Sequence, residues 1–226
     1  MEEFVIEAKE SLIRTKENQH VCCLQRDVRA FYHSDYHGGS NWKIKGKIEY
    51  LICTMKNDKA RCDEFILQDC ENKLNSILFS DLRQILRETN SQMLPWVVCV
   101  VPRAKREDYY RPEQKRFRST IQNLVNSFSN SEFIDGTQNI IRHTDTMTTH
   151  SSRVPGGYRL TGGESPYCGI TKETCNISGV KGKNILLIDD VYTKSVGIDE
   201  DAIQALYDNG ANEVIFYSVG KTYKKI

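Results

Sequence analysis

Residues 183–197 read Lys-Asn-Ile-Leu-Leu-Ile-Asp-Asp-Val-Tyr-Thr-Lys-Ser-Val-Gly, and the fold class follows from this stretch. Its four consecutive apolar residues, Ile185 to Ile188, are β-branched at both ends and too few for a helix. This pattern is typical of a strand that is buried on both faces of a parallel sheet. Two carboxylates, Asp189 and Asp190, stand at the C-terminal end of the strand, where open α/β sheets bind their ligands. The stretch therefore predicts an α/β fold with a ligand site directly after this strand.

A short loop and a predicted helix follow the acid pair. Residues 199–210 carry acids in the first turn, apolar residues at Ile203 and Leu206, and Gly210 where a left-handed residue would end the helix. Carboxylates accept hydrogen bonds from vicinal sugar hydroxyls, while loop N–H groups and the helix dipole bind phosphate. This order predicts a site for a phosphorylated sugar. The alternative is an ordinary Rossmann-like strand that ends in two solvated acids.

The strand, acids and loop resemble the signature with which type I phosphoribosyltransferases bind 5-phosphoribosyl 1-diphosphate (PRPP). The loop of that family runs Thr-Thr-Gly-x-Thr, whereas here it runs Thr193-Lys194-Ser195-Val196-Gly197. Ser195 replaces the central glycine, which lets the backbone approach the phosphate, and Gly197 replaces a hydroxyl donor. Lys194 adds a positive charge that can compensate in part.

The resemblance implies a Rossmann-like, three-layer type I phosphoribosyltransferase fold with a central, mostly parallel sheet and an N-terminal elaboration. It places Asp189 and Asp190 on the ribose hydroxyls as the catalytic acids, and residues 193–197 on the 5′-phosphate. The cofactor that it implies is Mg²⁺, held largely by oxygens of the sugar and diphosphate, so no direct protein ligand is assigned. The reaction would transfer phosphoribosyl from PRPP to an unidentified acceptor and release pyrophosphate.

A second buried strand is predicted at residues 96–101, closed by Pro102 and followed by a basic stretch from Arg103 to Arg118. In type I phosphoribosyltransferases the loop after this strand contacts the pyrophosphate. The resemblance therefore makes Arg103, Lys105 and Arg106 the candidate pyrophosphate ligands. For residues 111–118 a solvated, basic start of a helix is an equally good interpretation.

Within the family, the ComF branch, named for a DNA-uptake competence protein, is the most similar. Its chains share a strand that ends in Val-Pro, a basic loop, an aromatic residue and a helix with a polar start. A preceding apolar helix ends in a dipeptide similar to Met55-Lys56. The four-cysteine zinc finger of ComF is missing here. The likeness keeps open a non-catalytic alternative, in which the protein senses PRPP or a nucleotide and assists DNA uptake or DNA-linked phage defence.

Length and composition limit the remaining choices. The 226 residues suit one domain with an elaboration, and we expect a hood element or extension at residues 1–45 before a phosphoribosyltransferase-like domain at 46–226. The net charge of +1 does not indicate nucleic acid or a membrane as the main partner. Without a long apolar run or a basic N-terminus, we expect no membrane contact and a cytoplasmic protein. A homodimer, and a protein or DNA partner for the basic stretch, remain open.

Other segments carry weaker signals. The apolar spacing predicts a helix at residues 4–16, two helices within 58–88 and a final strand at 213–219. Residues 27–41 look irregular, and their two histidines, His33 and His37, are better explained as structural groups than as metal ligands. Paired glycines between Thr146 and Tyr167 indicate a lid over the reacting centre.

Overall fold

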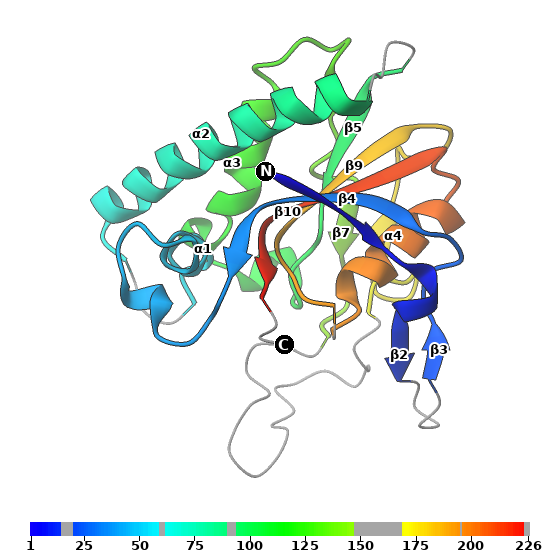
Figure 1. Cartoon of the computed structure of the whole chain (residues 1–226), viewed down its shortest axis with the longest axis horizontal. Coiled ribbons are helices and arrows are strands. Elements are labelled where there is room, and N and C mark those ends of the chain that lie inside the picture. Colours follow the sequence, from blue (N-terminus) through cyan, green and yellow to red (C-terminus); the bar gives the residue numbers. More distant parts are fainter. Residues whose placement is uncertain (15–19, 59–61, 90–93, 147–168, 195, 224–226) are drawn as a thin grey trace.

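The computed structural model describes residues 1–14, 20–58, 62–89, 94–146, 169–194 and 196–223. Its centre is a six-stranded sheet in the order β1-β4-β10-β9-β5-β6 (Figure 1). All neighbouring strands are parallel except the edge strand β1, which is antiparallel to β4. The predicted α/β class with a mostly parallel sheet is therefore confirmed. In sheet order, the strands span Glu2–Ile6, Val28–Tyr36, Glu213–Thr222, Asn184–Tyr192, Trp96–Val100 and Phe133–Asp135.

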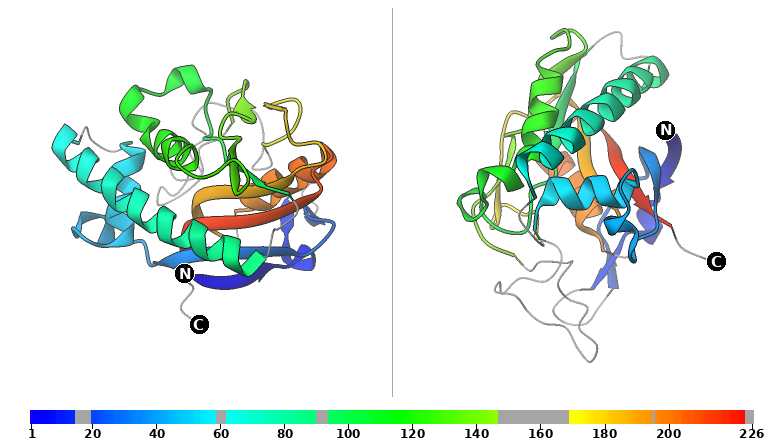
Figure 2. Two further views of the ribbon diagram at one scale, coloured as in Figure 1. Left: turned by 90° about the horizontal axis from the view of Figure 1, so that it is seen from above. Right: turned by 90° about the vertical axis from the view of Figure 1, so that its left-hand side faces the viewer.

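Helices cover both faces of this sheet and make three layers (Figure 2). The helices α1, α2 and α3 pack on one face, and α4 packs on the other. Their bounds are Ile48–Lys56, Glu64–Thr89, Arg116–Val125 and Ile198–Asp208. Short 3₁₀ helices lie at Ala8–Glu10 (η1), Asn41–Lys43 (η2), Glu107–Tyr109 (η3) and Pro112–Gln114 (η4). Two small antiparallel sheets pair β2 (Leu12–Arg14) with β3 (His20–Cys22) and β7 (Ile140–Arg142) with β8 (Cys175–Ile177).

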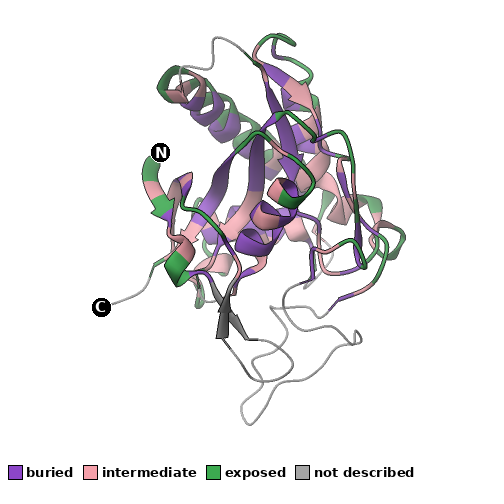
Figure 3. Cartoon of the chain, turned by 90° about the vertical axis from the view of Figure 1, so that its right-hand side faces the viewer, coloured by how far each residue is buried: buried purple, intermediate pink, exposed green. Residues whose placement is uncertain are grey.

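Strand β9 lies in the middle of the sheet and supplies both halves of the core. Leu186 and Ile188 pack with the α1–α3 layer, while Ile185 and Leu187 pack with α4. All four side chains are fully buried, which confirms the prediction of a strand covered on both faces. Figure 3 shows this burial along the central strands, with exposure confined mainly to loops and outer helix faces. Gly210 follows the cap residue of α4, Asn209, and has a φ of 85°, so the predicted left-handed stop is also confirmed.

The strand order reverses between β5 and β9. From β5 the chain passes through α3 to β6 on one side, and β9 then leads through α4 to β10 on the other side. In open α/β sheets, the crevice at such a reversal, beyond the carboxyl ends of the two strands, is where ligands bind. The topology therefore predicts a ligand site beside the residues that follow Val100 and Ile188.

The N-terminal predictions need correction. The helix expected at residues 4–16 is wrong, because residues 2–6 form β1 with alternating exposure, 53% for Val5 and 2% for Ile6. The segment expected to be irregular, 27–41, contains the nine-residue strand β4. Helix α2 is one continuous helix of 26 residues rather than a pair. Residues 1–45 thus contribute β1 and β4 to the same sheet as the rest of the chain. Among the described helices, none is long and apolar enough to span a bilayer.

A buried carboxylate holds α2 on the sheet. Asp81 of α2 is 3% exposed, and its Oδ2 accepts a hydrogen bond from the Tyr217 hydroxyl at 2.7 Å. The same oxygen lies 2.9 Å from Nδ1 of His33 on β4. His33 is therefore a hydrogen-bonded structural group, as the sequence predicts. A buried carboxylate is costly unless such partners satisfy it.

We expect Tyr217→Phe to lower the free energy of unfolding by about 1.5–3 kcal/mol, the usual value of a hydrogen bond to a charged group. Chemical denaturation measures this change. Tyr109→Phe is the matched control, because the Tyr109 ring is 67% exposed and the same atom is removed there at little cost. Equal stability of the two variants would show that Asp81 does not depend on Tyr217.

Candidate functional site

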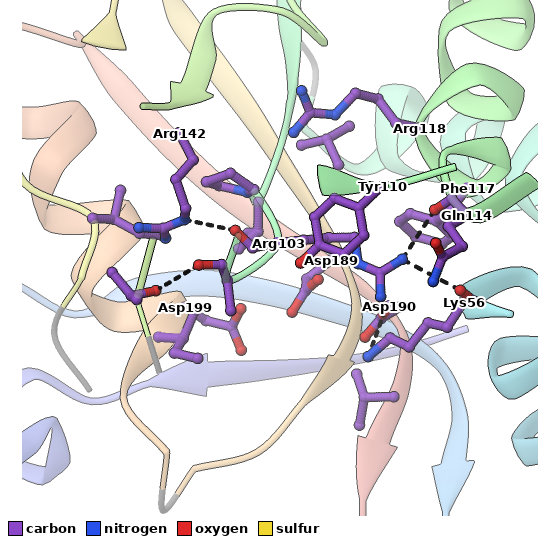
Figure 4. A pocket seen from close by; sticks show the side chains of 18 of the residues that line it. Lys56, Arg103, Tyr110, Gln114, Phe117, Arg118, Arg142, Asp189, Asp190 and Asp199 are labelled. Carbon is purple, nitrogen blue, oxygen red and sulfur yellow. Dashed lines mark hydrogen bonds and ion pairs between the residues drawn. The ribbon is translucent and has the colours of Figure 1, made fainter. Parts of the chain in front are cut away.

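A cavity of about 160 Å³ opens at the C-terminal ends of β5 and β9, at the reversal of strand order (Figure 4). Elements from every layer contribute to its wall: the end of α1, the loop after β5, the start of α3, the end of β7 and the start of α4. The polar and charged side chains in this wall are those of Lys56, Asp58, Arg103, Glu107, Gln114, Lys115, Arg118, Arg142, Thr146, Asp189, Asp190, Thr193 and Asp199.

The two acids that follow Ile188 both lie in the cavity wall, and each already has a partner. Asp190 Oδ2 is 2.8 Å from Nζ of Lys56, the last residue of α1. The carboxyl of Asp189 shares a hydrogen bond with that of Asp199, in the first turn of α4. The acid pair is thus contacted from both helical layers. Its role in binding ribose stays a prediction.

Burial and mutual repulsion control the protonation of these groups. Burial and the charge of Asp190 raise the pKa of Asp189 to about 7. Burial and the charge of Asp189 raise the pKa of Asp199 well above its usual range. Burial by itself lowers the pKa of Lys56, but the charges of Asp190 and Asp189 outweigh it, so this pKa is raised. Near neutral pH, Lys56 is charged and a proton remains between Asp189 and Asp199.

The predicted phosphate loop reaches the cavity with two of its residues, Thr193 and Val196. The Thr193 hydroxyl lies 2.7 Å from that of Thr222 on β10, and the N–H of Val196 donates to the Thr193 carbonyl. Lys194 forms an ion pair with Glu10 of η1 instead of lining the cavity. Ser195 lies outside the described residues.

Gly197 begins α4 with a φ of 76°, in the left-handed region. A glycine suits this position, because a β-branched residue is strained in this conformation. Three acids follow in the first turn, Asp199, Glu200 and Asp201, and all are buried. The helix therefore supplies its own negative charges at its N-terminus. Phosphate binding at this loop would depend on its N–H groups and hydroxyls more than on the helix dipole.

The three candidate pyrophosphate ligands have different surroundings. Arg103 lines the cavity, but its guanidinium binds both oxygens of Asp58, at 2.5 and 2.6 Å, and stacks on Tyr110. It also donates to the Lys56 carbonyl at the end of α1. Lys105 is buried and its Nζ donates to the Thr146 carbonyl, while Arg106 is exposed and faces carboxylates outside the cavity. The structure brings only Arg103 of the three to the cavity.

Two other arginines line the cavity, and the sequence analysis did not single them out. The Arg118 side chain is 11% exposed, and its Nη1 lies 3.1 Å from Glu107 without a hydrogen bond of good geometry in the described structure. The solvated interpretation is therefore wrong for Arg118. Arg142 donates to the carbonyls of Arg103 and Gly169. Burial lowers the pKa of both guanidinium groups. The position of Arg142 directly after the apolar pair Ile140-Ile141 was the available signal.

Tyr192, two residues after the acid pair, is buried and donates to Glu200, so it packs in the core. The predicted lid lies outside the described residues except for Thr146. Within the described ranges, no group of three or more His, Cys, Asp or Glu side chains is arranged to hold a metal. Asp189 and Asp190 still fit Mg²⁺, which commonly binds one or two carboxylates together with substrate phosphates.

The chain matches no model of a known protein family, and no curated protein matches its sequence. Its site must therefore be interpreted from geometry and chemistry.

We expect Gly197→Thr to lower the free energy of unfolding by about 1–2 kcal/mol, because a side chain at this positive φ is strained. Gly197→Asn is the matched comparison, since asparagine tolerates the left-handed region. Urea denaturation of both variants tests the prediction. If the threonine variant is as stable as the asparagine variant, the backbone here does not require a glycine.

Proposed function

We propose that the protein binds PRPP in the cavity between β5 and β9 and transfers its phosphoribosyl group to an acceptor, on a type I phosphoribosyltransferase fold. The observation that carries the proposal is the placement of the acid pair. Asp189 and Asp190 follow the doubly buried part of the central strand β9 at the reversal of strand order, and they face a cavity that the loop after β5 also lines. This is the position where open α/β sheets bind nucleotides and related phosphates.

The charges around the cavity support a ligand that carries both hydroxyls and phosphates. Acidic groups, those of Asp189, Asp190 and Asp199, gather at the end of β9 and the start of α4. Buried guanidinium groups of Arg118 and Arg142 lie in the same wall with incomplete carboxylate pairing. A carboxylate accepts hydrogen bonds from a diol, and a guanidinium binds a diphosphate. PRPP carries both kinds of group.

In the proposed reaction, the bond between C1′ of the ribose and the pyrophosphate oxygen breaks through an oxocarbenium-like state. Asp189 and Asp190 orient the sugar through its hydroxyls, and Thr193 with the loop N–H groups holds the 5′-phosphate. Arg118, with Lys56 displaced from Asp190, stabilises the negative charge that develops on the diphosphate. When bound, Mg²⁺ would neutralise further charge on the diphosphate. The acceptor attacks C1′ and takes the place of pyrophosphate.

The non-catalytic alternatives differ in what they require. A PRPP sensor would use the same cavity without releasing pyrophosphate, and the internal partners of Asp189, Asp190 and Lys194 suit such a protein. A DNA partner would need free positive charge on residues 103–118. Four arginines in that stretch lie within ion-pair distance of carboxylates, so this alternative gains no support from the geometry: Arg103, Arg106, Arg116 and Arg118.

Isothermal titration with PRPP and Mg²⁺ tests the proposal, and we expect Asp189→Asn to weaken binding tenfold or more. A hydrogen bond to a charged group contributes about 1.5–3 kcal/mol, and 1.4 kcal/mol corresponds to a factor of ten. Asp189 is preferred to Asp190 because Asp190→Asn would also remove the negative charge that pairs with Lys56. Asp208→Asn, at the exposed far end of α4, is the control.

Absence of PRPP binding by the wild-type protein would refute the proposal. Binding without pyrophosphate release over a panel of bases would instead assign a sensor.

A second prediction tests whether Arg118 or Arg106 binds the diphosphate. Arg118→Gln should weaken the binding of PRPP, and of pyrophosphate with Mg²⁺, by about tenfold, while its effect on ribose 5-phosphate should be small. Arg106→Gln is the matched control, because the Arg106 side chain is 55% exposed and lies outside the cavity wall. If only Arg106→Gln weakens pyrophosphate binding, the diphosphate occupies the outer loop, as the sequence predicts.

A further inference from the structure

The C-terminal end of α1 is held by arginines from the segment that follows β5. Helix α1 ends at Lys56, and its cap residue Asn57 has a left-handed backbone with a φ of 50°. The last carbonyls of a helix have no partner within the helix, so groups outside it must supply one. Here Nη1 of Arg103 donates to the Lys56 carbonyl at 3.3 Å, and Nη2 of Arg111 donates to the Asn57 carbonyl at 3.2 Å. These contacts fix the last turn of α1 to the loop after β5.

The guanidinium of Arg103 uses both of its terminal nitrogens in contacts within the protein (Figure 4). Besides the Lys56 carbonyl, Nη1 reaches the Gln114 carbonyl at 3.0 Å. The other nitrogen, Nη2, donates to both oxygens of Asp58, one of which also accepts from the Gln114 amide at 2.9 Å. A diphosphate that bound these two nitrogens would have to break four hydrogen bonds and release the end of α1.

The side chain of Lys56 extends from the same turn into the cavity. Its Nζ lies 2.8 Å from Oδ2 of Asp190, and the two side chains are only 20% and 14% exposed. A lysine side chain is long and flexible, so fixing it in one position costs conformational entropy. Helix ends fray, and a frayed last turn would withdraw Lys56 from Asp190. The ion pair in the cavity therefore depends on the contacts that hold the backbone of the helix end.

We propose that Arg103 is a positioning residue: it holds the last turn of α1 and thereby places the Lys56 ammonium at Asp190, where Lys56 and not Arg103 meets the diphosphate. This role differs from the one expected for Arg103 from the sequence, which was direct contact with pyrophosphate. The proposal rests on the proposed function for the identity of the anion. The dependence of Lys56 on Arg103 belongs to the protein alone and does not require a ligand.

Positioning and simple charge effects predict opposite results when Arg103 is removed. The positive charge of Arg103 opposes that of Lys56, so its loss through space alone would strengthen the ion pair between Lys56 and Asp190. If Arg103 acts by holding the helix end, its loss instead weakens the pair. The sign of the change therefore identifies the mechanism.

A double-mutant cycle on stability, measured by urea denaturation of the full chain without ligand, tests the dependence. Lys56→Met and Asp190→Asn should be non-additive in the wild-type background, because each alone leaves a poorly solvated charge uncompensated. In the Arg103→Gln background we expect this non-additivity to fall by about half or more, and in the Arg106→Gln background to stay unchanged. Arg103→Lys keeps the charge but not the planar fork, so it should behave like Arg103→Gln and replaces it if the glutamine variant does not fold.

Two results of this cycle would overturn the proposal. One is non-additivity that stays equal or grows without Arg103, as through-space charge alone requires. The other is strict additivity in the wild-type background, because Lys56 would then not be held at Asp190.

Titration with PRPP and Mg²⁺ separates this proposal from the proposed function. Arg103→Gln should weaken PRPP binding about tenfold when Lys56 is present and by no more than about twofold in the Lys56→Met background. An equal loss in both backgrounds would mean that Arg103 itself contacts the diphosphate, and the positioning role would fail. If PRPP does not bind the wild-type protein, the phosphoribosyltransferase proposal fails, while the stability cycle still decides the role of Arg103.

Discussion

The burial of β9 on both faces is the constraint on which the rest of the molecule depends. A parallel strand in the middle of the sheet must be apolar on both sides, and Ile185 to Ile188 meet that requirement in four residues. Beyond Ile188 the strand continues to Tyr192, and Asp189 and Asp190 line a cavity there. The same strand that joins the two halves of the core therefore determines where two carboxylates lie. The position of the site is a consequence of core packing.

Partly buried carboxylates need compensation, and each helical layer supplies some. Lys56, at the end of α1, contacts Asp190, and Asp199, at the start of α4, contacts Asp189. Arg103 links the two sides by donating to the last carbonyl of α1 while its own carbonyl accepts from Arg142. Removing one partner of a buried charge is more costly than the pair is stabilising. A ligand that enters the cavity must consequently replace contacts that the protein already makes.

Only part of the fold and of the candidate site could be predicted from the sequence. The central strands, the acid pair, the loop and α4 could be predicted because each is a local pattern: an apolar run, a charge pair, a glycine at a helix end. The strand nature of β4 could not, since Tyr32, His33 and Tyr36 obscure its alternation. Lys56 and Arg118 were recognisable only as basic residues near helix ends. Their place in the wall of one cavity arises from contacts between elements far apart in the chain, such as the contact of Lys56 with Asp190, which no local pattern encodes.

The ion pair between Lys194 and Glu10 bears directly on whether the altered loop can hold a phosphate. Both side chains are more than two-fifths exposed, at 45% and 43%, and exposed pairs contribute about 0–1 kcal/mol. A charge-assisted hydrogen bond to a less solvated phosphate contributes more, about 1.5–3 kcal/mol. A phosphate that reached the loop would therefore draw Lys194 away from Glu10 at little cost. The contact that holds Lys194 outside the cavity is therefore weak, so the present position of this lysine does not argue against phosphate binding.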